Sequence, residues 1–367
     1  MARHENGPSR SVHVLVVDDS AVVRQVMTAI LSPQPGLTVT VAADPIIARA
    51  KMQRSRPDVI LLDLEMPRVD GMTFLREIMA TDPLPVVVCS ALTGAGTEAA
   101  MQALDEGAVD VIGKPQIGVH DFLEESAARL VDAVRAASEA RLSRLVRRAR
   151  AVPVEPKLPA DVVLRPRPHL ATSVSADKLI AMGASTGGTE ALRVILEAMP
   201  ESAPGIVIVQ HMPERFTAAF ARRLDETCRL RVKEAEDGDP VVAGRALVAP
   251  GDRHLLVHRG AGGYVVELRN GPLVSRHRPS VDVLFRSVAQ AAGASAVGIL
   301  LTGMGDDGAT GLLEMKTAGA TTIAQDEATS VVFGMPKEAI ARGAAGTVLP
   351  LGQIAPGVRR IFSLGEE

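Results

Sequence analysis

The feature that most constrains the fold of this chain is an alternation of short apolar runs with amphipathic stretches, which occurs twice along its 367 residues. In the first half the amphipathic stretches have helical periodicity, as at Val22, Val26 and Ile30. Strands that alternate with helices form a parallel sheet covered by helices, because parallel strands need long crossover connections. We therefore predict a doubly wound α/β domain whose strands are the runs Val12–Val17, Val39–Ala43, Val59–Leu62, Val86–Cys89 and Val109–Ile112.

The second half of the chain, from about Lys178, repeats this pattern and is also predicted to be α/β. Between about 231 and 269 the apolar runs become shorter, and Gly260-Ala-Gly-Gly263 is typical of the turn in a β-hairpin. We therefore expect a second doubly wound parallel sheet that carries a small β-hairpin insertion. Its strands are predicted near residues 178–183, 205–210, 297–301, 320–325 and 346–349.

The two halves are separated by residues 151–176, which contain five prolines and show little periodicity. Such a stretch predicts an extended linker rather than a folded element. The arginine-rich residues 141–150 before it carry apolar side chains on one side, which indicates a helical extension with a solvated basic face or a contact for an acidic partner. Residues 1–11 are polar, and we predict that they are disordered.

The composition limits the class of function. A net charge of −3 gives no general attraction to nucleic acid or anionic membranes, and a chain with no Trp and one Tyr offers no aromatic surface for stacking bases. No apolar run is long enough to span a membrane, and the polar N-terminus lacks the apolar region of a secretory signal. Cys89 and Cys228 form neither a disulfide framework nor a metal motif. We therefore expect a cytoplasmic protein with no nucleic-acid partner and no membrane insertion.

Ser185 carries the strongest indication of chemistry. It lies in Gly183-Ala-Ser-Thr-Gly187, between an apolar strand and a helical pattern, and fits the G-x-S-x-G elbow that exposes a serine oxygen on a sharp turn. A serine is a poor nucleophile unless a base takes its proton, so further residues are required. The glycine-rich turn is also compatible with a phosphate-binding loop of a nucleotide-binding domain, although it lacks the Lys-Ser/Thr ending of such loops.

Two other strand ends of the second half offer a base and an acid. One buried strand ends on His211, and another is followed by a glycine-rich loop that contains Asp306 and Asp307. Each residue alone has a simpler explanation, a helix cap for the histidine and a solvated turn for the aspartates. However, the carboxyl ends of parallel strands meet at the edge where such sheets bind ligands. Together with Ser185 the set predicts a hydrolase, with either aspartate as the acid.

The strand ends of the first half carry a different set of side chains: Asp18, Asp19, Asp63, Ser90 and Lys114. Three carboxylates at one sheet edge repel each other unless a cation is bound, and oxygen ligands of this kind suit Mg²⁺. An aspartate beside Mg²⁺ can accept a phosphoryl group, and the lysine and the serine hydroxyl can then bind phosphoryl oxygens. Helix caps explain single aspartates but not the whole set.

Over roughly residues 12–137 the chain resembles the receiver domain of two-component response regulators. The motifs that carry the resemblance are Val16-Val-Asp-Asp-Ser20, Leu62-Asp-Leu-Glu-Met-Pro67, Cys89-Ser90 and Lys114-Pro115. Val111 stands where many receivers have an aromatic switch residue. We therefore do not expect signalling through rotation of an aromatic ring.

The receiver resemblance implies the roles of the acidic set. It implies that Asp63 is the phosphoacceptor and that a histidine kinase is the phosphodonor. It also implies Mg²⁺ as cofactor of this domain, with Ser90 and Lys114 binding the phosphoryl group. The implied metal site consists of Asp18, Asp19, Asp63 and the carbonyl of Glu65.

Over about residues 178–364 the chain resembles the catalytic domain of the chemotaxis protein-glutamate methylesterase (CheB) family. The matching motifs are Gly183-Ala-Ser-Thr-Gly-Gly188, Gln210-His-Met-Pro213, Ala249-Pro-Gly251 and Leu301-Thr-Gly-Met-Gly-Asp-Asp-Gly-Ala309. The resemblance implies that Ser185 is the nucleophile, His211 the base and Asp307 the acid that orients the histidine. The order Ser, His, Asp differs from that of α/β-hydrolases, so the elbow does not predict that fold.

The methylesterase resemblance also implies a substrate. It implies hydrolysis of glutamate γ-methyl esters on methyl-accepting chemoreceptors with release of methanol, and deamidation of receptor glutamine by the same acyl chemistry. No cofactor is expected for the esterase reaction. Thr186 and Met304, on the glycine loops, are the expected oxyanion or substrate contacts. The resemblance further suggests that the unphosphorylated receiver packs against the hydrolase and hinders access to Ser185.

We therefore predict a flavodoxin-like receiver over residues 12–137, a helical extension and proline-rich linker over 138–176, and a Rossmann-like methylesterase domain over 177–367. The alternative is a non-enzymatic two-component adaptor whose receiver gates a protein–protein contact. The complete Ser, His and Asp set argues against that alternative, because an adaptor needs no such set.

Overall fold

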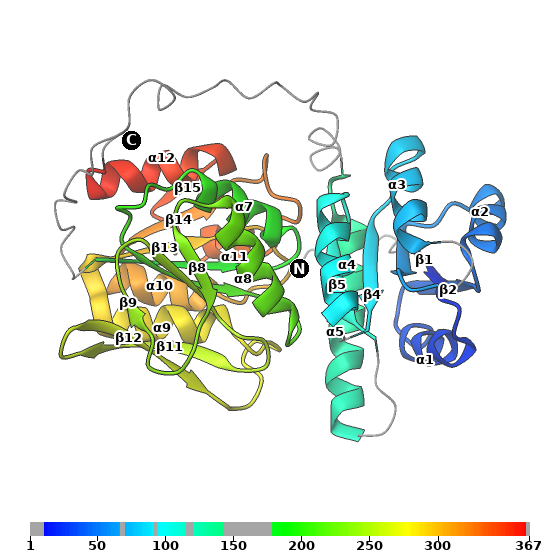
Figure 1. Ribbon diagram of the computed structural model, residues 1–367, viewed down its shortest axis with the longest axis horizontal. Helices are drawn as coiled ribbons and strands as arrows, with labels where there is room; N and C mark the ends of the chain where they lie inside the picture. Colours follow the sequence, from blue (N-terminus) through cyan, green and yellow to red (C-terminus); the bar gives the residue numbers. More distant parts are fainter. Residues whose placement is uncertain (1–10, 67–69, 92–93, 115–119, 143–177, 365–367) are drawn as a thin grey trace, which may run out of the picture.

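The computed structural model describes residues 11–66, 70–91, 94–114, 120–142 and 178–364. The predicted N-terminal segment 1–11 therefore lies outside the described residues except for Ser11, and so do most of the helical extension and the linker. The described residues form two α/β units that lie side by side (Figure 1). We refer to residues 11–142 as the N-terminal unit and to residues 178–364 as the C-terminal unit.

The N-terminal unit is a five-stranded sheet in the order β2-β1-β3-β4-β5, and each neighbouring pair is parallel. This is the flavodoxin-like order, and it confirms the predicted doubly wound fold. Its elements are β1 (Val12–Val17), α1 (Ala21–Leu31), β2 (Leu37–Ala42), α2 (Pro45–Arg54), β3 (Val59–Asp63), α3 (Gly71–Thr81), β4 (Val86–Ser90), α4 (Gly94–Asp105), β5 (Asp110–Gly113) and α5 (His120–Glu139). Predicted and observed strand bounds differ by at most two residues, since strand ends are poorly marked by periodicity.

The C-terminal unit contains a seven-stranded parallel sheet in the order β15-β14-β13-β6-β7-β10-β8. Its strands are β6 (Leu179–Ala184), β7 (Gly205–Gln210), β8 (Arg231–Glu234), β10 (Arg245–Val248), β13 (Ala296–Leu300), β14 (Thr321–Gln325) and β15 (Thr347–Leu349). The helical elements are α7 (Gly188–Glu197), α8 (Phe216–Thr227), α9 (Val281–Ala292), η3 (Gly293–Ser295), α10 (Ala309–Thr317), α11 (Met335–Ala341) and α12 (Leu351–Phe362). The predicted second parallel sheet is therefore confirmed.

The predicted hairpin is present as β11 (His254–Gly260) and β12 (Gly263–Arg269), which pair antiparallel around the glycine turn. The structure adds a third strand, β9 (Pro240–Val241), so that the insertion is a small three-stranded sheet. The two residues of β9 are too short to give a periodic signal, which is why the sequence pattern did not reveal this strand.

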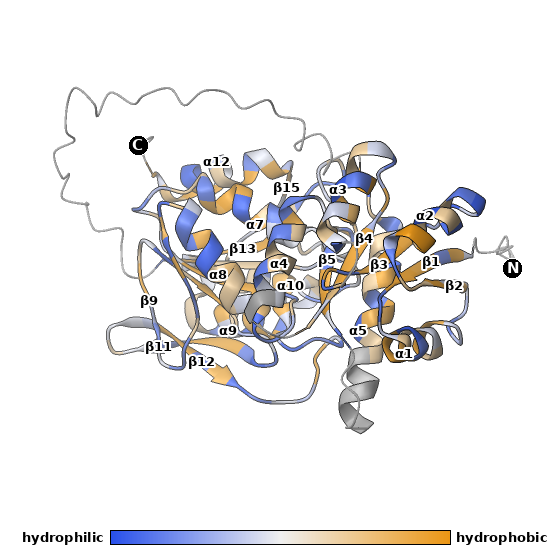
Figure 2. Cartoon of the chain, turned by 45° about the vertical axis from the view of Figure 1, so that its right-hand side comes forward, coloured by the Kyte–Doolittle hydropathy of each residue, from blue (hydrophilic) through white to orange (hydrophobic). Residues whose placement is uncertain are grey.

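Each sheet is buried between helices. All residues of β3, β4, β6, β7 and β13 are buried, which is why these strands read as continuous apolar runs rather than alternating ones. Figure 2 shows the strands of the N-terminal unit coloured mostly as hydrophobic, with hydrophilic residues on the helices around them. None of the helices in the described part of the chain combines the length and apolar character needed to cross a bilayer.

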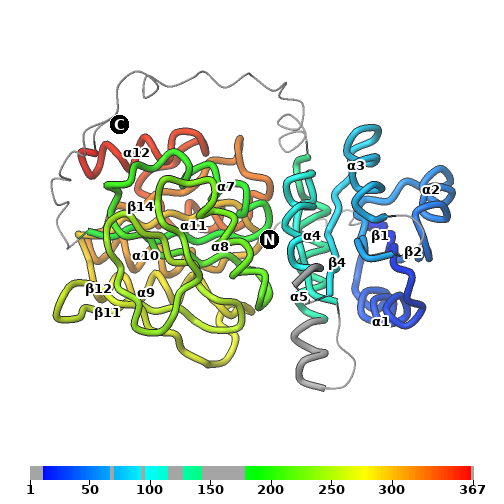
Figure 3. The backbone as a smooth tube through the Cα atoms, in the orientation of Figure 1, coloured from blue at the N-terminus to red at the C-terminus, as the bar shows by residue number. Residues whose placement is uncertain are grey.

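Helices α4 and α5 of the N-terminal unit face the C-terminal unit, as the backbone trace shows (Figure 3), and Asp110 of β5 accepts a hydrogen bond from Thr186. Helix α4 packs against α7 and α8. Val331 and Val332, in the loop before α11, join the apolar cluster of the N-terminal unit, and Val331 O accepts a 3.1 Å hydrogen bond from Arg141 N. Exposed ion pairs Asp105–Arg223 and Arg141–Glu327 lie at the edges of this interface. The contact therefore has an apolar centre and a charged rim, as protein interfaces generally do.

Candidate active site

The predicted hydrolase residues meet at one edge of the seven-stranded sheet. Ser185 directly follows β6, His211 directly follows β7, and Asp307 lies in the loop after β13. Strands β6 and β13 are neighbours, and the chain proceeds from β6 to β7 on one side but from β13 to β14 on the other. This is the topological switch point of the sheet, where the connecting loops separate and leave a crevice for a ligand.

A tight turn holds Ser185 between the ends of β6 and β13. Its N–H donates to Thr302 O at 3.0 Å and its carbonyl accepts from Gly188 N at 2.7 Å. Gly187 has φ of 76°, a left-handed conformation that glycine adopts without strain. A Cβ atom on Gly303 would lie 2.7 Å from Ser185 Cβ, so the β13 loop can approach the serine only because a glycine stands there. The G-x-S-x-G pattern therefore corresponds to a sharp strand-to-helix turn.

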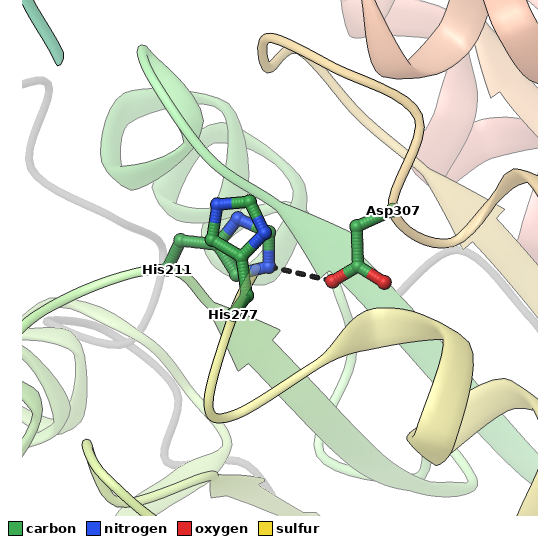
Figure 4. A group of neighbouring side chains, drawn as sticks. All are labelled: His211, His277 and Asp307. Atoms are coloured by element: carbon green, nitrogen blue, oxygen red, sulfur yellow. Dashed lines mark hydrogen bonds and ion pairs between the residues drawn. The ribbon is translucent and has the colours of Figure 1, made fainter. Parts of the chain in front are cut away.

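His211 is placed by the end of β7 and is oriented by Asp307. Its N–H donates to Ala184 O at 3.1 Å, and its Nε2 lies 2.8 Å from Asp307 Oδ2 (Figure 4). An ionised carboxylate only accepts hydrogen bonds, so Nε2 carries the proton and Nδ1 is the free basic nitrogen. Nδ1 is buried and has no hydrogen-bond partner among the described residues. The ring is therefore available to take a proton at Nδ1.

No hydrogen bond joins Ser185 to His211 within the described residues. Such catalytic hydrogen bonds are often long without substrate and tighten in the complex. The histidine side chain is only 7% exposed, so its acceptor nitrogen is largely sheltered from water. The arrangement supplies an oriented base with an open acceptor position.

Asp307 is fully buried at the N-terminus of α9, where backbone N–H groups point at it. Its Oδ1 accepts from Ser280 Oγ at 2.7 Å and from Asp282 N at 3.0 Å, and its Oδ2 accepts from Val281 N at 2.7 Å as well as from His211. Burial alone would raise the pKa of Asp307, but the hydrogen bond and charge of His211 and the N–H of Asp282 hold it below its ordinary value. The helix N-terminus adds to this stabilisation of the charge. The carboxylate is thus held ionised.

The structure distinguishes between the two adjacent aspartates, either of which the residue pattern allowed as the acid. Asp307 points inward to His211, whereas Asp306 is exposed and pairs with Arg342. Gly308, with φ of 89°, directly follows Asp307 and caps α10. Only Asp307 is in a position to orient the histidine.

Three residues of the site were not identified from the sequence: His277, Ser280 and Asp282. Ser280 caps α9, and Asp282 Oδ1 accepts from the N–H groups of Gly308 and Gly311, which fixes the loop that carries Asp307. The sequence signal was present, since a serine before an apolar helical pattern is a typical N-cap. It did not reveal that this cap would lie against a loop more than twenty residues away. His277 stacks on His211 and had no sequence signal.

The predicted oxyanion contacts flank the serine. Thr186 and Met304 both line the cavity next to Ser185 and His211. Within the described residues, the backbone N–H of Met304 and that of Thr186 have no acceptor in a hydrogen bond. The Thr186 hydroxyl, in contrast, is engaged. Both amides are therefore free to donate to an oxygen that develops charge at the site.

The N-terminal unit closes one side of this site. Thr186 Oγ1 donates to Asp110 Oδ2 of β5 at 2.9 Å, and burial between the units raises the pKa of Asp110 to about 6. Arg276 lies 4.0 Å from Asp132 of α5. A cavity of about 340 Å³ remains between the units, lined by residues of both, including Ser185 and His211. The candidate hydrolase site is therefore covered by the N-terminal unit.

The acidic set of the N-terminal unit also comes together at a switch point, between β1 and β3. Carboxylate oxygens of Asp18, Asp19 and Asp63 lie within 4.8 Å of one another. Lys114 Nζ lies 2.7 Å from Asp63 Oδ2 and 3.3 Å from Asp18 Oδ2. The structure thus brings the predicted acids and the lysine into one cluster. The turn after β1 is tied by Arg24, which donates to the carbonyls of Asp18 and Asp19.

This cluster fits a divalent cation. Burial raises the pKa of Asp18, and Asp63 raises it further, although Lys114 opposes both effects. Asp18 Oδ2 is buried, and within the described residues its only partner is Lys114 Nζ, in an ion pair at 3.3 Å. A carboxylate oxygen left in this way is a preferred ligand for a hard cation. One lysine does not compensate three carboxylates, so a divalent ion would balance the charge.

Ser90 and Glu65 lie beside the cluster. Ser90 is buried, and its hydroxyl donates to Gly96 O at 2.8 Å, so it would have to rotate to reach a phosphoryl oxygen on Asp63. The backbone N–H of Glu65 donates to Asp63 Oδ1 at 3.0 Å. Glu65 is exposed and lies next to the acidic cluster. Val111, which stands where many receivers have an aromatic switch residue, is buried in the core.

Comparison with known proteins is consistent with this geometry. The family described as CheB methylesterase matches residues 180–358, and the response regulator receiver domain matches residues 14–124. A protein-glutamate methylesterase/protein-glutamine glutaminase of Anaeromyxobacter dehalogenans is 62% identical over 94% of this chain and 97% of its own length. Another, from Geobacter metallireducens, is 58% identical over 96% of this chain and 99% of its own length.

One solved structure is similar to the C-terminal unit. The CheB methylesterase catalytic domain of Thermotoga maritima is 41% identical, with a TM-score of 0.49, and the match covers 50% of this chain and 98% of that domain. The similarity to the relatives from Anaeromyxobacter dehalogenans and Geobacter metallireducens extends over both units.

Proposed function

The chain belongs to the CheB methylesterase family with an N-terminal receiver domain, and from this premise we propose that it hydrolyses glutamate γ-methyl esters of chemoreceptors through Ser185, His211 and Asp307. It is thus a hydrolase whose activity is regulated by phosphorylation. The observation that carries the residue assignment is the Asp307–His211 pair, which leaves Nδ1 of the histidine free beside the elbow of Ser185.

The reaction follows from these positions. Nδ1 of His211 takes the hydroxyl proton of Ser185 as the serine oxygen attacks the ester carbonyl, and Asp307 stabilises the imidazolium that forms. The oxyanion of the tetrahedral intermediate accepts hydrogen bonds from the amides of Thr186 and Met304, each worth about 3 kcal/mol of transition-state stabilisation. The imidazolium then protonates the leaving methoxide, which departs as methanol. Water, deprotonated by the same histidine, hydrolyses the acyl-enzyme to glutamate and free serine.

The same acyl chemistry supports the second activity in the names of the relatives, protein-glutamine glutaminase. A glutamine side chain offers the same γ-carbonyl, and its amide leaves as ammonia once the histidine protonates the nitrogen. We propose that this chain deamidates receptor glutamine at the same serine.

The receiver supplies regulation. We propose that Asp63 accepts a phosphoryl group from a histidine kinase, forming an acyl phosphate, and that Asp18, Asp19, Asp63 and the Glu65 carbonyl hold Mg²⁺. When bound, Mg²⁺ neutralises charge on the transferred phosphoryl group. Lys114 pairs with a phosphoryl oxygen from its present place beside Asp63, and the Ser90 hydroxyl turns from Gly96 to bind another.

We also propose that the covered site is the repressed form. The N-terminal unit contacts Thr186, next to the nucleophile, and residues of both units line the cavity over the site. A helix of a receptor bundle, with a diameter of about 10 Å, needs an open approach to Ser185. Phosphorylation would shift the units toward an open arrangement. The functional boundaries that we propose are 12–137 for the receiver, 138–176 for the extension and linker, and 177–367 for the hydrolase.

The deciding experiment measures methanol release from methylated receptor membranes by the full chain, with and without a small acyl-phosphate donor. We expect release that rises with the donor and is abolished in Ser185→Ala. A chain that binds receptors but releases no methanol beyond the Ser185→Ala background would instead support the non-enzymatic adaptor.

A further inference from the structure

The ring of His277 lies flat against the ring of His211. The two ring centroids are 3.7 Å apart and the planes differ by 5° (Figure 4). The two rings are therefore stacked, and His277 lies against one face of the proposed base. On its edge, the same base is held by Asp307.

The segment that carries His277 is shaped to hold the ring in this place. Val274 and His277 exchange backbone hydrogen bonds of 3.1 and 2.9 Å across a tight turn. The two residues between them, Ser275 and Arg276, both have left-handed backbone conformations, with φ of 50° and 68°. Such conformations are costly for non-glycine residues and persist only where the surroundings impose them. The turn continues into Ser280, whose hydroxyl donates to Asp307.

One segment therefore holds both partners of His211. Ser280 and the first amides of α9 fix the carboxylate at the edge of the histidine, and His277 fixes its face. The ring of His277 is itself fixed, because its Nδ1 lies 2.7 Å from Ser275 O. A carbonyl only accepts, so this Nδ1 carries the proton.

The environment keeps His277 neutral. Burial lowers its pKa, the proximity of His211 lowers it further, and the result is about 3, although Asp307 on the facing loop opposes both effects. Arg129 of α5 acts in the same direction as His211. At neutral pH the surface offered to His211 is therefore an uncharged π face. Such a face attracts a cation above it, and His211 becomes a cation when it takes the serine proton.

A shared metal ion is a poor alternative for this pair. Nitrogen atoms of His211 and His277 and an oxygen of Asp307 lie within 4.8 Å of one another. However, a histidine binds a metal along its ring plane, and two parallel stacked rings direct their nitrogen lone pairs side by side rather than toward one point. Metal binding would require the stack to break.

We propose that His277 is a positioning residue for the esterase reaction: its neutral ring holds the plane of His211 so that Nε2 stays on Asp307 and Nδ1 stays available to Ser185. The proposal rests on the proposed function and names a residue outside its triad. It predicts that the flat face of the side chain matters more than its nitrogen atoms, of which Nδ1 only helps to hold the ring through Ser275 O.

The test compares three full-length variants in the methanol-release assay with a phosphodonor: His277→Ala, His277→Phe and His258→Ala. Alanine removes the face, phenylalanine keeps a flat ring that cannot titrate, and His258 is a partly exposed histidine on β11 paired with Glu267. We expect His277→Ala to lower kcat by about 10- to 100-fold with little change in KM, as loss of base alignment does. We expect His277→Phe to recover activity to within about threefold of the parent and His258→Ala to match the parent.

The pH profile of kcat/KM separates positioning from general destabilisation. His277→Ala is expected to move the acidic limb, because the base loses its neutral neighbour, whereas His277→Phe keeps the limb in place. Full activity in His277→Ala, or equal loss in the alanine and phenylalanine variants, would overturn the proposal. Thermal unfolding checks that each variant is folded, and if His277→Ala is not, the His277→Phe profile alone decides. Ser185→Ala in the same assay tests the proposed function itself. Activity that persists in this variant would contradict the proposed catalytic triad as well as the role of His277.

Discussion

The two strand-edge sites of this molecule hold their buried aspartates in opposite ways. Asp307 receives four hydrogen bonds, from His211, Ser280, Val281 and Asp282, and these hold its pKa below the ordinary value against the effect of burial. Asp18 Oδ2 has no partner in the described part of the chain other than Lys114 Nζ at 3.3 Å, and burial raises the pKa of Asp18 although Lys114 opposes this effect. Both lie at the switch point of a parallel sheet.

The difference matches the two kinds of chemistry that we propose for these sites. A carboxylate that orients a histidine must stay charged with no external help, so the protein provides every partner. A carboxylate that binds a cation must keep lone pairs free, and its charge is incompletely balanced until the ion arrives. The number of donors around a buried acid thus indicates which task it performs. The predictions below test this distinction.

The largest effect is expected at the acid of the hydrolase. Asp307→Asn should lower the esterase rate by about 10³- to 10⁴-fold, because the amide cannot hold His211 in its present tautomer or stabilise the imidazolium. Asp306→Asn is the matched control, since its carboxylate faces solvent and pairs with Arg342. Asp306→Asn should change the esterase rate by less than about threefold. If the two variants exchanged these effects, the assignment of the acid would be wrong.

The second prediction concerns the acid of the receiver. Asp63→Asn should reduce labelling by an acyl-phosphate donor to background, because the nucleophilic carboxylate is gone. Asp19→Asn should still be labelled but should need about tenfold more Mg²⁺, since it removes one of the proposed ligands. Labelling is followed with a radioactive donor over a Mg²⁺ titration. Undiminished labelling of Asp63→Asn would show that Asp63 is not the phosphoacceptor.

The third prediction contrasts the two acids in stability. Without Mg²⁺ at pH 7, Asp18→Asn should raise the free energy of unfolding by about 1 kcal/mol, because it removes a buried charge that lacks a full set of partners. Asp307→Asn should lower it by about 1–3 kcal/mol, because it breaks a satisfied network. Urea unfolding of both variants measures these values.

The contributions of Asp18 and Asp307 to the free energy of unfolding depend on pH in opposite directions. The raised pKa of Asp18 means that the folded protein gains stability as pH falls through that pKa. The lowered pKa of Asp307 means that its contribution is present above the ordinary value of 3.8 and is lost as pH falls through the folded pKa. Addition of Mg²⁺ should reverse the Asp18→Asn effect, since only the parent gains the binding free energy. If both substitutions changed the free energy of unfolding in the same direction without Mg²⁺, the distinction between the two acids would be wrong.

The fourth prediction concerns the interface between the sites. A fragment that starts near residue 166 should have a basal esterase rate about tenfold above that of the unphosphorylated full chain, equivalent to about 1.4 kcal/mol of closure free energy. It should also be insensitive to phosphodonor. A fragment no faster than the full chain would rule out occlusion, and the receiver would then act by direct activation or by recruitment to the receptor.

Much of this organisation could be predicted from the sequence. The apolar runs located the strands because buried parallel strands are continuously apolar, and residues at strand ends share an edge of the sheet. Ser185, His211 and Asp307 were therefore found as a set, and so were Asp18, Asp63 and Lys114. The choice between Asp306 and Asp307 could be made only from the family resemblance until the loop geometry was known.

The residues that the sequence did not reveal act through contacts without a local pattern. Ser280 looks like an ordinary helix cap, and only the fold brings it against Asp307. His277 lies on an irregular turn, and stacking of two histidines has no spacing rule. Asp110 lies within the predicted strand Val109–Ile112, and its partner Thr186 is in the other unit. Interfaces between units are set by shape, which periodicity does not encode.

The smallest expected effect is a pH dependence of receiver repression through Asp110. Its pKa is about 6 when the units are closed and should return to the ordinary value of 3.8 when they open. The closed form therefore binds a proton more tightly, so repression should be strongest at low pH and should weaken as pH rises toward 6 and level off above it. Between pH 5 and pH 7 the ratio of fragment rate to full-chain rate should fall severalfold, and at most about tenfold. Taking this ratio cancels the titration of the triad, which both proteins share. In Asp110→Asn the ratio should be constant over the same range, because the amide accepts from Thr186 but does not titrate. A parent ratio that stays constant between pH 5 and pH 7 would show that this carboxylate does not bias the closed arrangement.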